Sequence, residues 1–209
     1  RIKNLFDLYC EPEAVYETLQ VMNTLQPGLC VLGTRLPGCF NVFEMSVRAV
    51  LGQQITVKAA STLAARLVAV YGTQVQTGIE GLTHSFPAPA AILALGENIS
   101  EHLGKLGIIS ARANTIYQLA RVLADEKNDF GFCGNPEEEM QKLQAIRGIG
   151  SWTAQYIAMR AMGWPDAFLP TDAGIKKALP DHTPKELQVL SEAWRPWRSY
   201  ATVNLWNTL

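Results

Sequence analysis

Two glycines around one isoleucine, Gly148-Ile149-Gly150, constrain the fold more than any other feature of this chain. Helical apolar patterns precede and follow them, starting at Leu143. A tight reversal between two packed helices demands positive φ values, which glycine adopts readily, and we expect this of both glycines. The sequence therefore predicts a helix, a glycine hairpin and a second helix. The unpaired amides at the start of that second helix, together with its macrodipole, suit a phosphate oxygen of any base sequence.

The helix after Gly150 has two different sides. One side carries small or apolar residues that allow close packing, and the other carries Trp152 and Tyr156 one turn apart, with Met159. From the helix alone, the aromatic pair is either ordinary core or the wall of a binding pocket. The packing side consists of Ala154, Ile157, Ala158 and Ala161.

The carboxylate of Asp172 comes just before the next helical run. Gly163-Trp164-Pro165 ends the helix, and another helical run extends from Ala173 to Leu179. Asp172 therefore occupies the position of an N-cap, which is the ordinary role of an aspartate there. Its place after a phosphate-binding hairpin and an aromatic pair also favours a catalytic role, and both interpretations stay open at this point.

Bulk properties limit the class of protein. A chain of 209 residues, 48% hydrophobic and 18% charged, can bury a sizeable core as one domain or two intimate lobes. The net charge of −1 argues against a protein that coats nucleic acid through bulk basicity, but not against binding through amides. The sequence shows neither an apolar run long enough to span a membrane nor a secretory signal. Cys10, Cys30, Cys39 and Cys133 lack the close pairs of a zinc or iron-sulfur site, which predicts reduced thiols in the cytoplasm.

Capping residues and periodicity predict about ten helices and no confident strand. Asn41 with Glu44, and Thr183 with Glu186, have the spacing of capping boxes. Residues 73–88 are rich in Thr, Gly and Pro and predict a loop. Besides the helices named above, we expect helices at about 12–22, 42–51, 56–71, 90–95, 100–103, 111–123, from 136, at 184–194 and from 196.

Three separated motifs resemble one known family. LQAIRGIGSWTAQYIAMRA followed by FLPTD is similar to the helix-hairpin-helix, Gly/Pro-rich loop and Asp signature of the DNA glycosylase superfamily. RLPGCFNVFEMSVRAVLGQQIT upstream and WRPWRSYATVNLW downstream extend the resemblance to AlkA-type 3-methyladenine DNA glycosylase II. It implies an all-α fold of two helical lobes, approximately 40–135 and 1–39 with 136–209, with the active-site cleft between them. The small sheet domain that usually precedes them in this family has no counterpart here, which we expect of a fragment.

The resemblance implies a monofunctional enzyme that excises alkylated bases such as 3-methyladenine from duplex DNA, as part of base excision repair. Asp172 would be the catalytic carboxylate. The pocket for the extruded base would be formed by Trp206, Trp152, Tyr156 and Gln53. Gly148, Ile149, Gly150 and Thr153 would contact DNA, and Gln54 would fill the gap left by the flipped nucleotide, although two glutamines at a helix junction are otherwise simply exposed loop residues.

The family pattern is not matched everywhere. Ala173 stands where an aromatic residue would follow the catalytic Asp, and Gln54 stands where the inserted residue would be apolar. Both leave the breadth of the substrate range open.

The resemblance also bears on cofactors and partners. It requires no cofactor, but it implies a structural Na⁺ or K⁺ held by backbone carbonyls of Gln144, Ile146 and Ile149. The expected partner is double-stranded DNA with alkylated bases, bound by a monomer in the bacterial cytoplasm.

Two other functions are weighed against this one. A bifunctional glycosylase and lyase of the endonuclease III type needs an amine in the hairpin, where this chain has Trp152, and often an iron-sulfur cluster. The other alternative is a non-catalytic helix-hairpin-helix module that only binds DNA.

Overall fold

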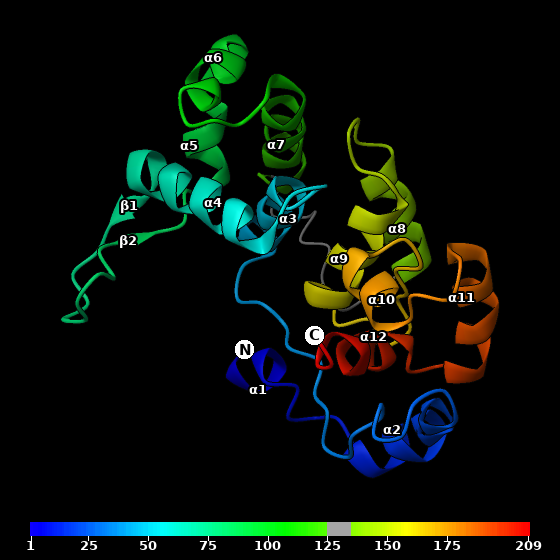
Figure 1. Ribbon diagram of the computed structural model, residues 1–209. Coiled ribbons are helices and arrows are strands. Elements are labelled where there is room, and N and C mark those ends of the chain that lie inside the picture. Colours follow the sequence, from blue (N-terminus) through cyan, green and yellow to red (C-terminus); the bar gives the residue numbers. More distant parts are fainter. Residues whose placement is uncertain (125–134) are drawn as a thin grey trace. The chain divides into compact units, whose positions relative to one another are not determined.

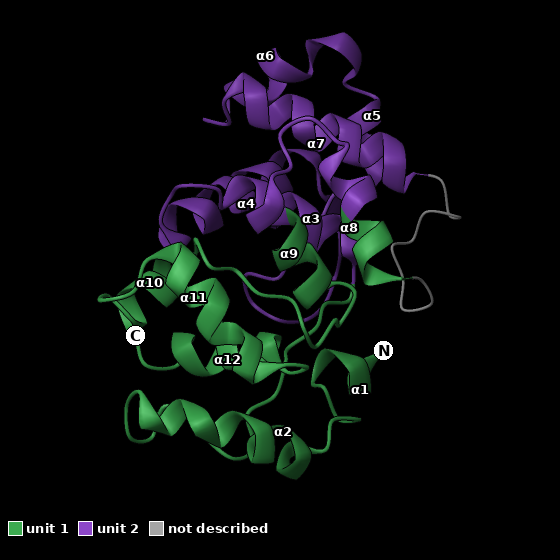
Figure 2. Cartoon of the chain, turned by 90° about the vertical axis from the view of Figure 1, so that its right-hand side faces the viewer, with its two compact units in different colours: residues 1–40, 132–140, 154–209 green, residues 41–131, 141–153 purple. Residues whose placement is uncertain are grey.

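The computed structural model describes residues 1–124 and 135–209, so Cys133 lies outside the described residues. The fold is all-α in character, as predicted, apart from one very short ribbon (Figure 1). The chain divides into two compact units (Figure 2). In its described parts, unit 1 comprises residues 1–40, 135–140 and 154–209, and unit 2 comprises residues 41–124 and 141–153. None of the helices in these ranges is long and apolar enough to cross a membrane.

Unit 2 is built around α7, a helix with a buried apolar face that contacts three other helices of the same unit. Thr56 caps α4 by accepting from the Ala59 amide. Residues 73–88 contain a two-stranded antiparallel ribbon with Thr73 opposite Ser85, where we expected only a loop. Strands of two residues are too short to give an alternating pattern in the sequence. The elements are α3 (Val42–Leu51), α4 (Val57–Tyr71), β1 (Thr73–Gln74), β2 (His84–Ser85), α5 (Pro89–Leu93), a 3-10 turn (Gly96–Asn98), α6 (Ile99–Gly104) and α7 (Ser110–Leu123).

Unit 1 packs α10 and η3 against α12. Two helices expected at 12–22 and 184–194 end earlier as α-helices and continue as 3-10 turns, a common way for a helix to finish. The elements are α1 (Ile2–Leu5), α2 (Pro12–Leu19), η1 (Gln20–Thr24), α10 (Ala173–Ala178), α11 (Pro184–Leu190), η3 (Ser191–Trp194) and α12 (Arg198–Trp206). Two further helices, α8 (Pro136–Gln144) and α9 (Ser151–Arg160), begin in one unit and end in the other.

The two predicted capping boxes differ in outcome. Thr183 and Glu186 form the complete box at the start of α11. At α3, the Asn41 side chain accepts from the Glu44 amide at 2.8 Å, but the Glu44 carboxylate accepts from Arg48 one turn later. An arginine four residues on offers the carboxylate a charged partner, which is favoured over the neutral cap amide.

A buried ionic cluster fixes α12 against the loop that leads to α10. Asp166 is 8% exposed, and its carboxylate accepts from Arg198 Nε at 2.7 Å and from Arg198 Nη2 at 2.9 Å. Arg195 pairs with the same carboxylate, and the Ser199 hydroxyl donates to the Trp164 carbonyl at 2.7 Å. Because a buried carboxylate with a bidentate partner has little freedom, the first turn of α12 is held in a defined place relative to the loop that leads to α10.

The first residues of the chain are also tied to α12. The Asp7 carboxylate accepts from the Leu36 amide at 2.9 Å and from the Tyr200 hydroxyl at 2.8 Å. Asp7 itself has a φ of 53°, a left-handed conformation that aspartate tolerates better than most residues. Tyr200 is 4% exposed, and burial raises the pKa of its phenol well above the ordinary value. The segment before α2 therefore forms part of the packing of unit 1.

Candidate active site

Asp172 is the N-cap of α10, as predicted. Its Oδ1 accepts hydrogen bonds from the amides of Gly174 at 2.9 Å and Ile175 at 3.0 Å. The indole Nε1 of Trp206, at the end of α12, donates to the same oxygen at 2.8 Å. The residue is 9% exposed. Three donors on one oxygen orient the carboxylate firmly and complement its negative charge.

Gly174 makes this arrangement sterically possible. A β-carbon at this position would lie 2.8 Å from Cδ1 and 2.9 Å from Nε1 of Trp206, and 3.0 Å from Oδ1 of Asp172. Contacts this short do not occur, so any side chain here would displace the indole from the carboxylate. Sequence reasoning missed Gly174, because a glycine in the first turn of a helix looks like a merely weak helix former.

The aromatic wall of unit 1 consists of Tyr156 and Trp206. Their ring centroids are 6.3 Å apart at an interplanar angle of 50°, and both residues are half-buried. The guanidinium of Arg160 lies 5.8 Å from the Tyr156 ring centroid, and its Nη1 donates to the Tyr156 hydroxyl at 3.4 Å. Tyr156 therefore already contacts one cation. Met159, which we expected on the same side of α9 as the aromatic residues, is fully buried in the core.

The hairpin between α8 and α9 is closed by one left-handed glycine rather than two. Gly148 has a φ of 97°, whereas Gly150 is not in the left-handed region. One such residue suffices because the Ile149 amide donates to the Ile146 carbonyl at 3.0 Å and closes the turn. A β-carbon on Gly148 would lie 2.0 Å from the Thr115 hydroxyl, so glycine is also required by close approach.

The hairpin donors that face outward are fewer than predicted. The amide of Ile149 is used inside the turn, and its side chain is 4% exposed. The Thr153 side chain is 3% exposed, and its hydroxyl accepts from Gln53. Among the described residues of unit 2, no acceptor bonds the amides of Gly148 and Gly150. These two amides are the hairpin donors that suit a phosphate.

Gln53 lies against the hairpin. Its Nε2 donates to the Gly148 carbonyl at 3.0 Å and to the Thr153 hydroxyl at 2.9 Å. Residues 141–153 belong to the same compact unit as Gln53, whereas the expected lobes placed them with the rest of 136–209. Gln54, the next residue, is exposed and has a φ of 55°. Trp152, at the first turn of α9, is half-buried.

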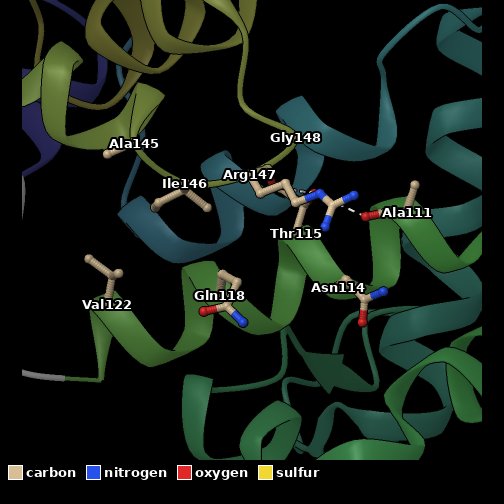
Figure 3. Close-up of a pocket in the computed structure, with 9 residues that line it drawn as sticks. All are labelled: Ala111, Asn114, Thr115, Gln118, Val122, Ala145, Ile146, Arg147 and Gly148. Carbon is tan, nitrogen blue, oxygen red and sulfur yellow. Dashed lines mark hydrogen bonds between the residues drawn. The ribbon is translucent and has the colours of Figure 1, made fainter.

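A cavity of about 790 Å³ lies between α7 and the hairpin within unit 2 (Figure 3). Asn114, Gln118 and Val122 line it from α7, and residues 145–148 line it from the hairpin. The Thr115 hydroxyl lies 3.0 Å from both the Ala111 and the Arg147 carbonyls. No carboxylate is among the residues that line the cavity.

The hairpin carbonyls fit the alkali-metal site that the family resemblance implies. Within the described ranges there is no group of three or more His, Cys, Asp or Glu residues that could hold a metal. Neutral carbonyl oxygens suit a hard cation, and the Ile146 carbonyl, which accepts from Ile149, keeps a second lone pair. Gln144, Ile146 and Ile149 are therefore chemically suited to this role.

Geometry of this kind defines a class: a helical protein with a glycine hairpin and a helix-capping carboxylate that accepts from an indole N–H. Residues 47–198 match the model of the HhH-GPD superfamily base excision DNA repair protein. The chain belongs to this superfamily.

Several proteins are similar to this chain over all or nearly all of its length. It is 37% identical over 208 residues to DNA-3-methyladenine glycosylase 2 of Escherichia coli, covering 100% of this chain and 70% of that protein. It is 40% identical over 215 residues to the probable bifunctional transcriptional activator/DNA repair enzyme AlkA of Mycobacterium tuberculosis, covering 100% of this chain but only 42% of that protein. The 3-methyladenine DNA-glycosylase from Archaeoglobus fulgidus shares the fold, with a TM-score of 0.74, 23% identity and coverage of 94% and 68%.

Proposed function

We propose that this chain is a monofunctional DNA glycosylase that hydrolyses the N-glycosidic bond of alkylated bases, such as 3-methyladenine, in double-stranded DNA. The observation that carries the proposal is the Asp172 carboxylate, held by two helix amides and the Trp206 indole. Membership of a base excision repair superfamily and full-length similarity to glycosylases named for 3-methyladenine support it. The chain is thus a hydrolase of base excision repair.

The chemistry needs only one carboxylate. When the bond between C1′ of the sugar and the base nitrogen breaks, its electron pair leaves with the base and positive charge develops on the sugar. The negative charge of Asp172 stabilises this transition state and orients the water that adds to C1′. The added water then loses a proton. A base alkylated on a ring nitrogen is cationic before cleavage and leaves as a neutral molecule. It therefore needs no general acid to protonate it.

Selectivity follows from the aromatic wall. A cationic base over an electron-rich ring gains about 0.5 to 2 kcal/mol relative to a neutral base. Since Arg160 already contacts Tyr156, Trp206 is the ring that contributes most. Extruding the base from the duplex costs a few kcal/mol and is least costly for a damaged or mispaired base, so selection begins before the pocket is reached.

The hairpin supplies the backbone amides that bind DNA. With a net charge of −1, the chain relies on the amides of Gly148 and Gly150 to hold a phosphate. We include in this proposal an alkali cation on the carbonyls of Gln144, Ile146 and Ile149, which would stiffen the turn. We further propose that the protein acts as a monomer in the cytoplasm, where chromosomal DNA is its substrate.

The proposal excludes a lyase step. Strand cleavage through a Schiff base needs a nucleophilic amine beside the sugar. The hairpin and α9, from Ala145 to Arg160, contain no lysine, and Trp152 stands at the position where the lyases carry one.

A base-release assay tests this function. Duplexes carrying 3-methyladenine should yield free base and an intact abasic strand, and borohydride treatment should give no covalent complex. A trapped complex would show a lyase. Binding to such duplexes without any release above the uncatalysed rate would show a non-catalytic DNA-binding module.

A further inference from the structure

The turn between α3 and α4 has an unusual backbone. Gln54 is exposed and adopts a φ of 55°, a left-handed conformation that a residue with a side chain rarely takes. Such a conformation is unfavourable and persists only where the surroundings determine it. The contacts of the residue before it are therefore informative.

Gln53 is held from two directions. Its side-chain Nε2 donates to the Gly148 carbonyl at 3.0 Å and to the Thr153 hydroxyl at 2.9 Å. Its backbone carbonyl accepts from the Arg112 guanidinium. A primary amide has two hydrogens, and these two acceptors use both. Gln53 has no hydrogen left to donate to a base unless it releases the hairpin.

Helix α7 holds the hairpin and the turn at once. Arg112 bonds to the turn, and Thr115, one helical turn further on, has its hydroxyl 3.0 Å from the Arg147 carbonyl at the hairpin tip. The absence of a side chain on Gly148 lets the hairpin approach Thr115 closely. Gln53, Arg112 and Thr115 thus connect three segments that are far apart in the sequence.

We propose that Gln53 and Arg112 are positioning residues that hold Gln54 at a fixed offset from the phosphate-binding amides of the hairpin. Gln53 is then not a hydrogen-bond donor to the base. This inference rests on the proposed function, because it assumes that Gln54 enters the duplex where a base has been extruded. The distance between Gln54 and the hairpin amides determines where the duplex is opened relative to the bound phosphate.

The step that requires both contacts together is extrusion of the base, not cleavage. Loss of the Gln53 or Arg112 contacts should therefore slow base release from a fully paired lesion more than from a mispaired one, since mispairing lowers the free-energy cost of extrusion. A residue that contacts the base would instead slow both substrates by the same factor. The ratio of the two rates distinguishes the roles.

The test uses Gln53→Leu, which keeps the approximate volume and removes both donors, with Gln141→Leu as a control. Gln141 is an exposed residue of α8 in unit 2. Single-turnover release of 3-methyladenine is measured on paired and mispaired duplexes, with extrusion followed by the fluorescence of a neighbouring 2-aminopurine. We expect Gln53→Leu to lower the paired rate about tenfold or more, because two hydrogen bonds are lost. It should lower the mispaired rate clearly less, and it should weaken the fluorescence change. The control should match the wild type.

Arg112→Ala provides a second variant that leaves the hairpin contacts of Gln53 in place. It should give the same change in the ratio of rates, so the inference stays testable if Gln53→Leu fails to fold. Equal losses on both substrates, or no loss on either, would overturn the inference. If the wild-type protein releases no base at all, the proposed function fails, and the fluorescence measurement still decides whether Gln53 governs distortion of the duplex.

Discussion

Substitution of Asp172 by asparagine separates the two roles of this residue. The amide oxygen of Asn can accept from Gly174 and Ile175 as Oδ1 does now, and Asn is as good an N-cap as Asp. The negative charge beside the sugar is lost. Folding and DNA binding should therefore survive while base release does not.

The contacts of Asp172 give the size of each effect. Asp172→Ala removes the cap, at about 0.5 to 2 kcal/mol, and leaves the Trp206 indole N–H without its acceptor, at about 1 to 3 kcal/mol. A total of roughly 1.5 to 5 kcal/mol lowers the melting temperature of a chain of this size by roughly 3 to 20 °C. Asp172→Asn loses only the charge assistance of three hydrogen bonds, about 1 kcal/mol, or a few degrees.

The rates of base release of the two variants should not follow the order of their stabilities. Removing one charge-stabilising group from an active site typically lowers the rate by about a hundredfold to a thousandfold, so both variants should fall at least that far. Release of 3-methyladenine is measured in single turnover, and the uncatalysed rate is subtracted at each time point because these bases are labile. If Asp172→Asn keeps the wild-type rate, Asp172 only caps α10 and another group performs the chemistry.

Three other predictions concern Gly174, the close approach at Gly148 and the binding of DNA. Gly174→Ala should displace the Trp206 indole and slow base release about tenfold or more with a change in melting temperature of only a few degrees; an unchanged rate would contradict the steric role. Gly148→Ala should lower the free energy of unfolding by about 1 to 3 kcal/mol, measured by urea titration, and Thr115→Ala should partly restore it by removing the clashing hydroxyl; an unaffected Gly148→Ala protein would be inconsistent with the close approach. DNA affinity should depend only shallowly on salt concentration, because amides displace few counterions, and a steep dependence would point to many lysine and arginine contacts instead.

The elements of the fold that are encoded locally could be predicted. Asp172 as a cap and the hairpin at Gly148 both depend on residues within one or two helical turns, where periodicity and capping patterns are informative. The pairing of Tyr156 with Trp206 came from resemblance to a family, since the two residues are fifty positions apart.

What could not be predicted depends on distant partners. Gly174 is required because of an indole on α12, and Gln53 bonds to residues that follow it by almost half the chain. Met159 shows the same limitation on a smaller scale. Its position on the helix was read correctly, but the neighbours that bury it lie elsewhere in the sequence.

The Asp7 contacts determine how far this chain could be shortened. Helix α1 has no buried residues, so the first ten positions look dispensable in any trimming experiment. Deleting them would remove the acceptor of the Tyr200 hydroxyl and of the Leu36 amide, and each buried group left without a partner costs about 1 to 3 kcal/mol. The penalty would fall on α12, two helical turns before Trp206, so a shortened protein could lose base recognition although no residue of the pocket had been touched.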